Sequence, residues 1–132
     1  MADSFNFELV SPEQLLISEA VSEVIVPAAD GEMTVMANHA PVMATVKPGI
    51  VEVKNTEGAL NRYVEFGGFV DILPEGCTIL AEKAVHVDDI DHEELAQRIQ
   101  NTREDLDDAT NDADKARIAE RLDHLTTLQN AF

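Results

Sequence analysis

Every glycine and proline in this 132-residue chain lies before Val87, and residues 88–132 contain neither. Glycine supplies positive φ angles and proline fixes φ near about −65°, so both residues mark turns. A long stretch without either favours uninterrupted helix. The distribution therefore predicts two parts, a turn-rich domain over residues 1–87 and a helical segment over residues 88–132.

Short apolar runs separated by turn residues fill the first part. Phe5, Phe7 and Leu9 alternate with polar residues, which is the period of a half-buried strand. Turn signals recur about every 8–12 residues, as in antiparallel sandwiches and barrels. We expect Pro27 to stop the strand before it. The further predicted strands are residues 15–17, 21–26, 33–36, 42–46, 50–54, 60–66, 69–73 and 77–85, which makes residues 1–87 an antiparallel β-sandwich.

Residues 88–132 have helical periodicity. Asp91 followed by Glu94 resembles a capping box at a helix start. A turn is expected at residues 110–112, so the two helices should form an antiparallel hairpin. The expected apolar faces contain Leu95, Ile99, Thr102 and Leu106 in the first helix, and Ile118, Leu122, Leu125 and either Gln129 or Leu128 in the second.

This hairpin is expected to be only marginally stable. Asp105, Asp107 and Asp108 crowd the end of the first helix, where the helix dipole disfavours negative charge. Each such carboxylate costs about 0.3–1 kcal/mol at low salt. We therefore expect a mobile appendage that needs a partner surface.

The charge of the chain excludes several classes of partner. Twenty-six acidic residues against nine basic ones give a formal net charge of −17. Nucleic-acid binding needs clustered Lys and Arg, and an anionic membrane surface would repel the chain. No segment has the length and apolarity of a membrane span, and residues 1–7 lack the basic start of a targeting peptide. We expect a cytoplasmic protein that does not insert into the bilayer.

Candidate catalytic groups are sparse. His92-Glu93 begins like a zinc-protease motif, but Ala96 stands where the second His would be needed. Cys77 lies in an apolar run and is expected to be a buried hydrophobe. Adjacent carboxylates such as Asp107 and Asp108 are typical of a solvated helix face, although they are the one feature that would favour an enzyme. We expect no metal, no cofactor and no catalysis, which leaves an interaction module.

A series of short motifs gives a more specific indication. In order they are Leu9 to Glu13, Asp30-Gly31-Glu32, His39-Ala40-Pro41, Lys47-Pro48-Gly49, Gly67-Gly68-Phe69 and Leu80-Ala81-Glu82. Over its whole length the chain resembles the ε subunits of bacterial F-type ATP synthases, a family with an N-terminal β-sandwich and a C-terminal helical hairpin. The alternative is a stand-alone β-sandwich binding module that shares this turn pattern. Where the family commonly has Pro-Gly before His-Ala-Pro, this chain has Ala37-Asn38, and Asn38 is expected to keep the left-handed turn.

The resemblance implies a non-catalytic rotor subunit of the central stalk, which couples proton-driven rotation of the c-ring to ATP synthesis through the γ subunit. It implies that Gly31 and Glu32 meet the polar loops of the c-ring. Ser11 and His39 match positions at the γ interface. Such a protein would be peripheral, on the cytoplasmic face of the bacterial inner membrane.

For the hairpin, the resemblance implies regulation. It can fold against the sandwich or extend toward the α and β subunits and inhibit ATP hydrolysis, with Lys115, Arg117 and Arg121 as candidate contacts. The many carboxylates of the hairpin lead us to expect weak inhibition. Some relatives bind ATP through an Ile/Leu-Asp-x-x-Arg-Ala motif, but Glu94 and Leu95 occupy its Arg and Ala positions here, so nucleotide binding is not expected.

Overall fold

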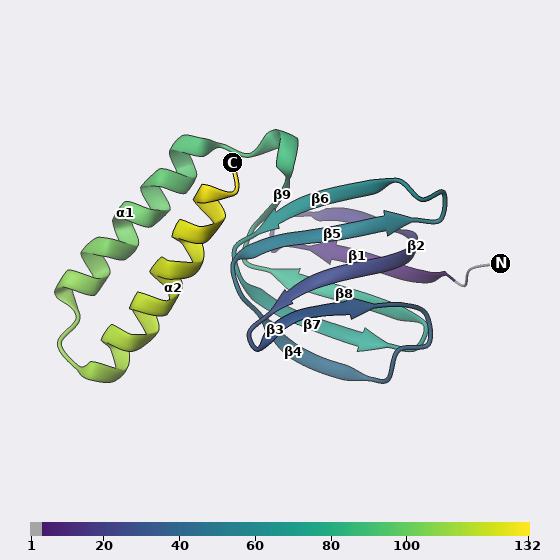
Figure 1. Cartoon of the computed structure of the whole chain (residues 1–132), viewed down its shortest axis with the longest axis horizontal. Helices are drawn as coiled ribbons and strands as arrows, with labels where there is room; N and C mark the ends of the chain where they lie inside the picture. The colour runs from purple at the N-terminus through teal and green to yellow at the C-terminus, as the bar shows by residue number, and fades with distance from the viewer. Residues whose placement is uncertain (1–3) are drawn as a thin grey trace. The chain divides into compact units, whose positions relative to one another are not determined.

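The structure is a computed structural model that describes residues 4–132. The residues 1–3 that entered the argument about targeting lie outside the described residues. The chain forms two compact units, with the boundary between Asp89 and Ile90. The first unit is a nine-stranded β-sandwich and the second is a pair of helices (Figure 1), so the fold class expected from the sequence is confirmed.

The strands alternate buried and exposed residues and are joined by tight turns. In β1, the buried Phe5, Phe7 and Leu9 alternate with more exposed residues, as the period of two predicted. The strands are β1 (Phe5–Val10), β2 (Leu15–Ala28), β3 (Gly31–Val35), β4 (Val42–Val46), β5 (Gly49–Asn55), β6 (Leu60–Glu65), β7 (Gly68–Leu73), β8 (Gly76–Ala81) and β9 (Ala84–His86).

The strand network folds over on itself around β2. Strands β1, β8, β7 and β4 are hydrogen-bonded in that order, and β2, β5, β6 and β9 continue the network, with β3 also on β2. The first half of β2 pairs with β1 and its second half with β5 and β3, so one strand belongs to both layers. The pairing of β1 with β8 is parallel, whereas the sequence led us to expect antiparallel neighbours throughout.

Two strand predictions were wrong. Residues 15–17 and 21–26 belong to one strand, and Pro27 lies inside it. Proline is tolerated because it sits one residue from the strand end, where its carbonyl accepts a hydrogen bond from the Lys47 N–H at 3.0 Å. Residues 77–85 form two strands, β8 and β9. β8 pairs with β7 in one layer and β9 pairs with β6 in the other, so the chain changes layer at residues 82–83.

The core lies between the layers and is apolar. Sixteen buried side chains form one cluster, so nearly every inward position of the strands contributes to it. Fully burying side chains of this size contributes about 1.5–3 kcal/mol each. Cys77 is among them, as predicted, and burial, with a smaller contribution from the Asp71 carboxylate, raises the pKa of its thiol to about 12. The members that are completely inaccessible are Phe7, Leu9, Val21, Val24, Val26, Val51, Val53, Val70, Ile72 and Ile79.

A second crossing joins β6 to β7 and runs beside the first. Gly67 has a φ of 101°, which a glycine adopts without strain, and its N–H donates to the fully buried Glu65 carboxylate at 2.7 Å. The Gly67 carbonyl accepts from the Glu82 N–H at 2.8 Å, which ties the two crossings together. Gly67 therefore lies where the two crossings are hydrogen-bonded to each other.

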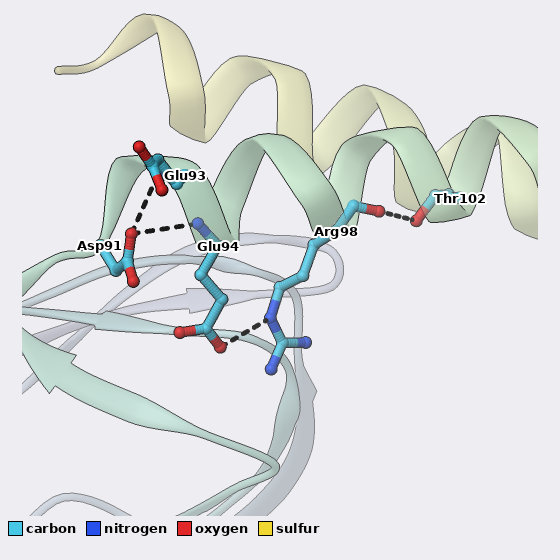
Figure 2. A network of polar contacts seen from close by, with 5 residues as sticks. All are labelled: Asp91, Glu93, Glu94, Arg98 and Thr102. Carbon is cyan, nitrogen blue, oxygen red and sulfur yellow. Dashed lines mark hydrogen bonds and ion pairs between the residues drawn. The ribbon is translucent and has the colours of Figure 1, made fainter.

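The second unit is an antiparallel pair of helices (Figure 1), α1 (His92–Asp108) and α2 (Asp112–Asn130). The Asp91 carboxylate caps α1 by accepting from the N–H groups of Glu93 and Glu94 at 3.0 and 3.1 Å (Figure 2). Asn111 caps α2 through the Asp114 N–H. The two helices bury the predicted residues Leu95, Ile99, Thr102, Leu125 and Leu128, whereas Leu106, Ile118 and Leu122 are only half-buried.

Candidate functional site

The sandwich has an apolar surface on the outside of β4, β7 and β8, which we call the outer apolar face. Its members are Met43, Phe69, Leu73 and Leu80, with exposed fractions of 73%, 56%, 43% and 53%. They point outward because their strand neighbours Val70, Ile72 and Ile79 point into the core.

Strand register brings these side chains together. Phe69 lies opposite Leu80, and Met43 lies opposite Asp71, between Phe69 and Leu73 of the neighbouring strand. Large apolar groups clustered on one sheet face are typical of a protein-binding surface.

The polar groups around this face are acidic or neutral. The register places Thr45 beside Phe69 and Thr78 beside Asp71, and Glu8 of β1 follows next to Thr78. Strands β1, β4, β7 and β8 contain no Lys or Arg. A complementary partner would therefore combine apolar side chains with basic groups.

Ser11 lies at one end of the outer face. It directly follows Val10, which pairs with Leu80. Ser11 and Gln14 exchange backbone hydrogen bonds at 2.9 and 3.2 Å and close the β1–β2 turn. The turn fixes the backbone of Ser11, whose side chain is half-buried.

His39 lies at the opposite end. Asn38 has a φ of 63°, which confirms the predicted left-handed turn, and its N–H donates to the Pro74 carbonyl at 3.0 Å. This bond ties the His39 loop to the turn that follows Leu73. The ring nitrogen Nδ1 of His39 lies 2.7 Å from the Ala40 carbonyl. Ser11 and His39, far apart in sequence, thus flank one surface.

Gly31 and Glu32 form the start of β3 at a tight hairpin. Gly31 has a φ of 134° and pairs with Ala28, so residues 29 and 30 alone make the turn. The Ala29 N–H donates to the Thr45 carbonyl at 2.9 Å, which holds the hairpin against β4. Glu32 is exposed. Its carboxylate is therefore presented from a fixed backbone.

The three predicted basic contacts of the hairpin occupy different surroundings. Lys115 is exposed on α2. Arg117 and Arg121 line an open groove of about 430 Å³ together with Asp105 and Asp108 of α1. Arg117 also lies 3.5 Å from Asp114. Two of the three cations therefore face carboxylates of their own hairpin.

Comparison with known proteins identifies the family. A family model described as the β-sandwich domain of the ATP synthase delta/epsilon chain matches residues 4–87. The ATP synthase epsilon chain of Mesorhizobium japonicum is 57% identical over 132 residues, covering 100% of this chain and 98% of the relative. This chain belongs to the ATP synthase epsilon chain family.

Other relatives agree with the family assignment. The epsilon chain of Rhizobium meliloti is 59% identical over 128 residues, covering 97% of this chain and 95% of the relative. A structure of the Euglena gracilis mitochondrial ATP synthase, OSCP/F1/c-ring, matches with a TM-score of 0.75 and 26% identity, covering 97% of this chain and 81% of that one. A Tetrahymena thermophila mitochondrial ATP synthase central stalk/c-ring structure matches with a TM-score of 0.53 and 15% identity, covering 70% of each chain, and shares the fold.

The positions of the family's nucleotide motif have structural roles in this chain. Both capping bonds of α1 go to the Asp91 carboxylate (Figure 2). Glu94, at the motif's Arg position, has its carboxylate 3.7 Å from the Arg98 Nε, and Leu95 is buried. These residues offer a carboxylate pair and an apolar side chain where a triphosphate would need cationic donors.

Two further observations concern ions and membranes. Residues 4–132 contain no group of three or more His, Cys, Asp or Glu side chains placed to hold a metal ion. Within the same residues, neither helix has the length and apolarity needed to cross a bilayer.

The outer apolar face was missed by the sequence argument. Its signal was available, because Phe69 to Leu73 places apolar residues on both faces of one strand, and a strand with one solvated face should alternate with polar residues. The sequence argument predicted a strand at residues 69–73 without assigning its two faces. Only the register shows that Phe69 and Leu73 share an exposed surface with Met43 and Leu80.

Proposed function

We propose that the chain is a non-catalytic rotor subunit of a bacterial ATP synthase, in which the sandwich couples rotation of the c-ring to ATP synthesis through the γ subunit. Membership of the epsilon chain family supports this role. The structural observation that supports this role most strongly is the outer apolar face, which is flanked by Ser11 and His39. In this role the protein is peripheral, at the cytoplasmic face of the inner membrane.

The outer apolar face is the proposed γ-binding surface. Its four side chains lose exposed apolar area on docking, which favours association by about 25 cal/mol per Å² before the costs of binding. Asp71, which lies between Phe69 and Leu73, and Glu8 on the β1 side favour a partner with basic groups and a salt-dependent association rate.

The test is co-purification of tagged protein with γ. We expect Phe69→Asp to reduce γ binding at least tenfold, because a carboxylate would replace an apolar side chain that is buried in the contact. Leu60→Asp is the matched control, since Leu60 is 58% exposed against 56% for Phe69 but lies on β6. Equal binding by both variants would remove the outer face from the proposal.

The tip of the β2–β3 hairpin is the proposed contact with the c-ring. Glu32 is exposed, and its backbone is fixed by pairing with Pro27 and by the neighbouring turn. A carboxylate held in this way gives orientation and modest affinity toward basic polar loops. The Euglena match, whose structure contains a c-ring, is consistent with this partner.

The hairpin is proposed to inhibit ATP hydrolysis weakly through contacts of Lys115, Arg117 and Arg121 with the α and β subunits. Two features argue that this inhibition is weak. Arg117 and Arg121 share a groove with carboxylates of α1. Residues 90–132 contain eleven acidic and five basic residues, so an extended hairpin carries a net charge of −6. Like charges brought together in a partly desolvated interface cost several kcal/mol.

A further inference from the structure

The two helices of the second unit are joined at one end by the chain and meet at the other end through two rings. Residues 109–111 connect α1 to α2. Because the helices are antiparallel, the start of α1 and the end of α2 lie together at the opposite, open end (Figure 1). There His92 and Phe132 contact each other edge to face, with ring centroids 5.7 Å apart and an interplanar angle of 80°. We call this contact the aromatic clasp.

Both rings of the aromatic clasp are carried on fixed backbone. His92 is the first residue of α1 and directly follows the capping residue Asp91. Phe132 lies beyond Asn130, the last residue of α2, but its N–H donates to the Gln129 carbonyl at 3.2 Å. Such a bond tightens the last turn of a helix. The ring of Phe132 is therefore positioned by α2 itself.

Phe132 differs from the other residues of its unit. It is the only Phe, Tyr or Trp in residues 90–132. Of the large apolar side chains that are exposed in the described residues 4–132, it is also the one that lies in the second unit. An aromatic pair changes an equilibrium constant by about two- to tenfold. A contact of this strength stabilises the paired helices and can still be broken reversibly.

Burial in the two helices is concentrated toward the end that the aromatic clasp closes. The buried side chains are Leu95, Ile99 and Thr102 in α1 and Leu125 and Leu128 in α2. Nearer the loop, Leu106, Ile118 and Leu122 are only half-buried. An open groove of about 430 Å³ is also lined there by residues of both helices. The loop end therefore contributes less apolar burial to the unit than the open end does.

Charge acts against the pairing of the helices. Residues 90–132 carry eleven acidic and five basic residues, and the resulting net charge of −6 favours separation. In the paired state, Arg117 and Arg121 of α2 line the groove together with Asp105 and Asp108 of α1. Separation of the helices takes both guanidinium groups away from these two carboxylates.

We propose that the aromatic clasp holds the end of α2 against the start of α1, and that its release lets the two helices separate. The consequence for regulation rests on the proposed inhibition of ATP hydrolysis by the hairpin. While the clasp is closed, Arg117 and Arg121 remain in the groove. When it opens, they become available to another subunit. The clasp thereby keeps the inhibition weak.

The test is the distance between spin labels on Ala96→Cys and Thr127→Cys in the full-length chain, in a Cys77→Ala background. Both labelled positions are exposed, one on each helix. Because α1 has 17 residues and is about 25 Å long, separation about the loop lengthens the label distance well beyond that of the paired helices. We expect Phe132→Ala to raise the ratio of long to short distances about two- to tenfold.

Further variants show whether the two rings act together. His92→Ala should have the same effect, and the double variant should open no further than either single variant, because one contact is lost in all three. Alanine is the strongest helix former, so opening in His92→Ala cannot result from loss of α1. His92→Phe restores an aromatic pair and should give the parent distances. The control His124→Ala removes an imidazole elsewhere on α2 and should also give the parent distances.

The inference fails if Phe132→Ala keeps the parent distances, or if the two single effects multiply in the double variant. ATP hydrolysis by the catalytic head separates this result from the proposed inhibition. We expect Phe132→Ala to inhibit hydrolysis more strongly than the parent, by about two- to tenfold. If the labels separate and hydrolysis does not change, the aromatic clasp is supported and the proposed inhibition by the hairpin is contradicted.

Discussion

Gly68 approaches the carbonyl of Leu80 so closely that a Cβ on Gly68 would lie 1.9 Å from that oxygen. Its φ of 152° is also one that side chains rarely adopt. Strands β7 and β8 meet at this point, and no flexible side chain is available to move aside. The contact therefore depends on glycine.

We expect Gly68→Ala to lower the free energy of unfolding by about 2–4 kcal/mol, because backbone strain and a backbone clash add. Gly58→Ala is the matched control, since its φ is 88° but nothing lies within 4 Å of the added methyl. Its cost should be about 1 kcal/mol. Urea unfolding measures the free energy of unfolding of both variants. Equal losses would show that the backbone of β8 moves to relieve the clash with Gly68→Ala.

Glu32→Lys should weaken coupling while the fold remains intact. The substitution reverses the charge at an exposed hairpin tip, so contact with basic loops becomes repulsive. Proton pumping in membranes reconstituted with this variant should fall. Glu57→Lys makes the same charge change in the exposed β5–β6 turn and should pump normally. Normal pumping by Glu32→Lys at both low and high salt would exclude Glu32 from the contact.

Removal of the hairpin should have a small effect on ATP hydrolysis. We expect a chain that ends before Asp88 to raise hydrolysis by the catalytic head less than tenfold over full-length protein, which corresponds to less than about 1.4 kcal/mol. The reason is the acidic excess of the hairpin and the groove that Arg117 and Arg121 share with Asp105 and Asp108. A larger increase would contradict the charge argument.

The isolated protein should not bind ATP at concentrations up to about 1 mM. A Kd of about 1 mM corresponds to a binding free energy of only about −4 kcal/mol. Glu94 supplies a carboxylate where the family's nucleotide motif has Arg. Titration calorimetry is the measurement. The double variant Glu94→Arg with Leu95→Ala restores the motif and serves as comparison. Saturable heat from the parent chain would contradict the prediction.

Stability should fall as the pH rises above about 9. The pKa of Cys77 is raised from 9.0 to about 12 in the folded protein, so between these values the folded state binds more protons than the unfolded state. The contribution is complete below pH 9.0 and is lost as the pH rises toward about 12. Tyr63 shifts in the same direction. Urea midpoints at pH 8 and about 10.5 should therefore differ less for Cys77→Ala than for the parent.

The local elements follow closely from residue type. The Asp91 cap, the left-handed Asn38 and the burial of Cys77 were each predicted, because each depends on one side chain and its immediate neighbours. Pro27 was misjudged because a proline is tolerated in a strand wherever no neighbouring strand needs its missing N–H, and the local sequence does not show where that is.

Features that depend on register could not be predicted in the same way. Phe69 and Leu80 become neighbours only when β7 pairs with β8. Likewise, the opposite positions of Ser11 and His39 on the outer face follow from two separate pairings. Local periodicity gives the side on which a residue lies but not the residue beside it.

The parallel pairing of β1 with β8 has a consequence for biosynthesis. Asn6 pairs with Gly76 and Val10 with Leu80. The first strand to be synthesised therefore cannot complete its pairing until β8, almost the last strand of the sandwich, has been made. Contacts this distant along the chain slow folding, because the loop between them must close first. A nascent chain that stops before β8 leaves one edge of β1 unpaired, and an unpaired strand edge favours aggregation. The sandwich can therefore complete its fold only after β8 has been synthesised, shortly before synthesis of the two helices begins.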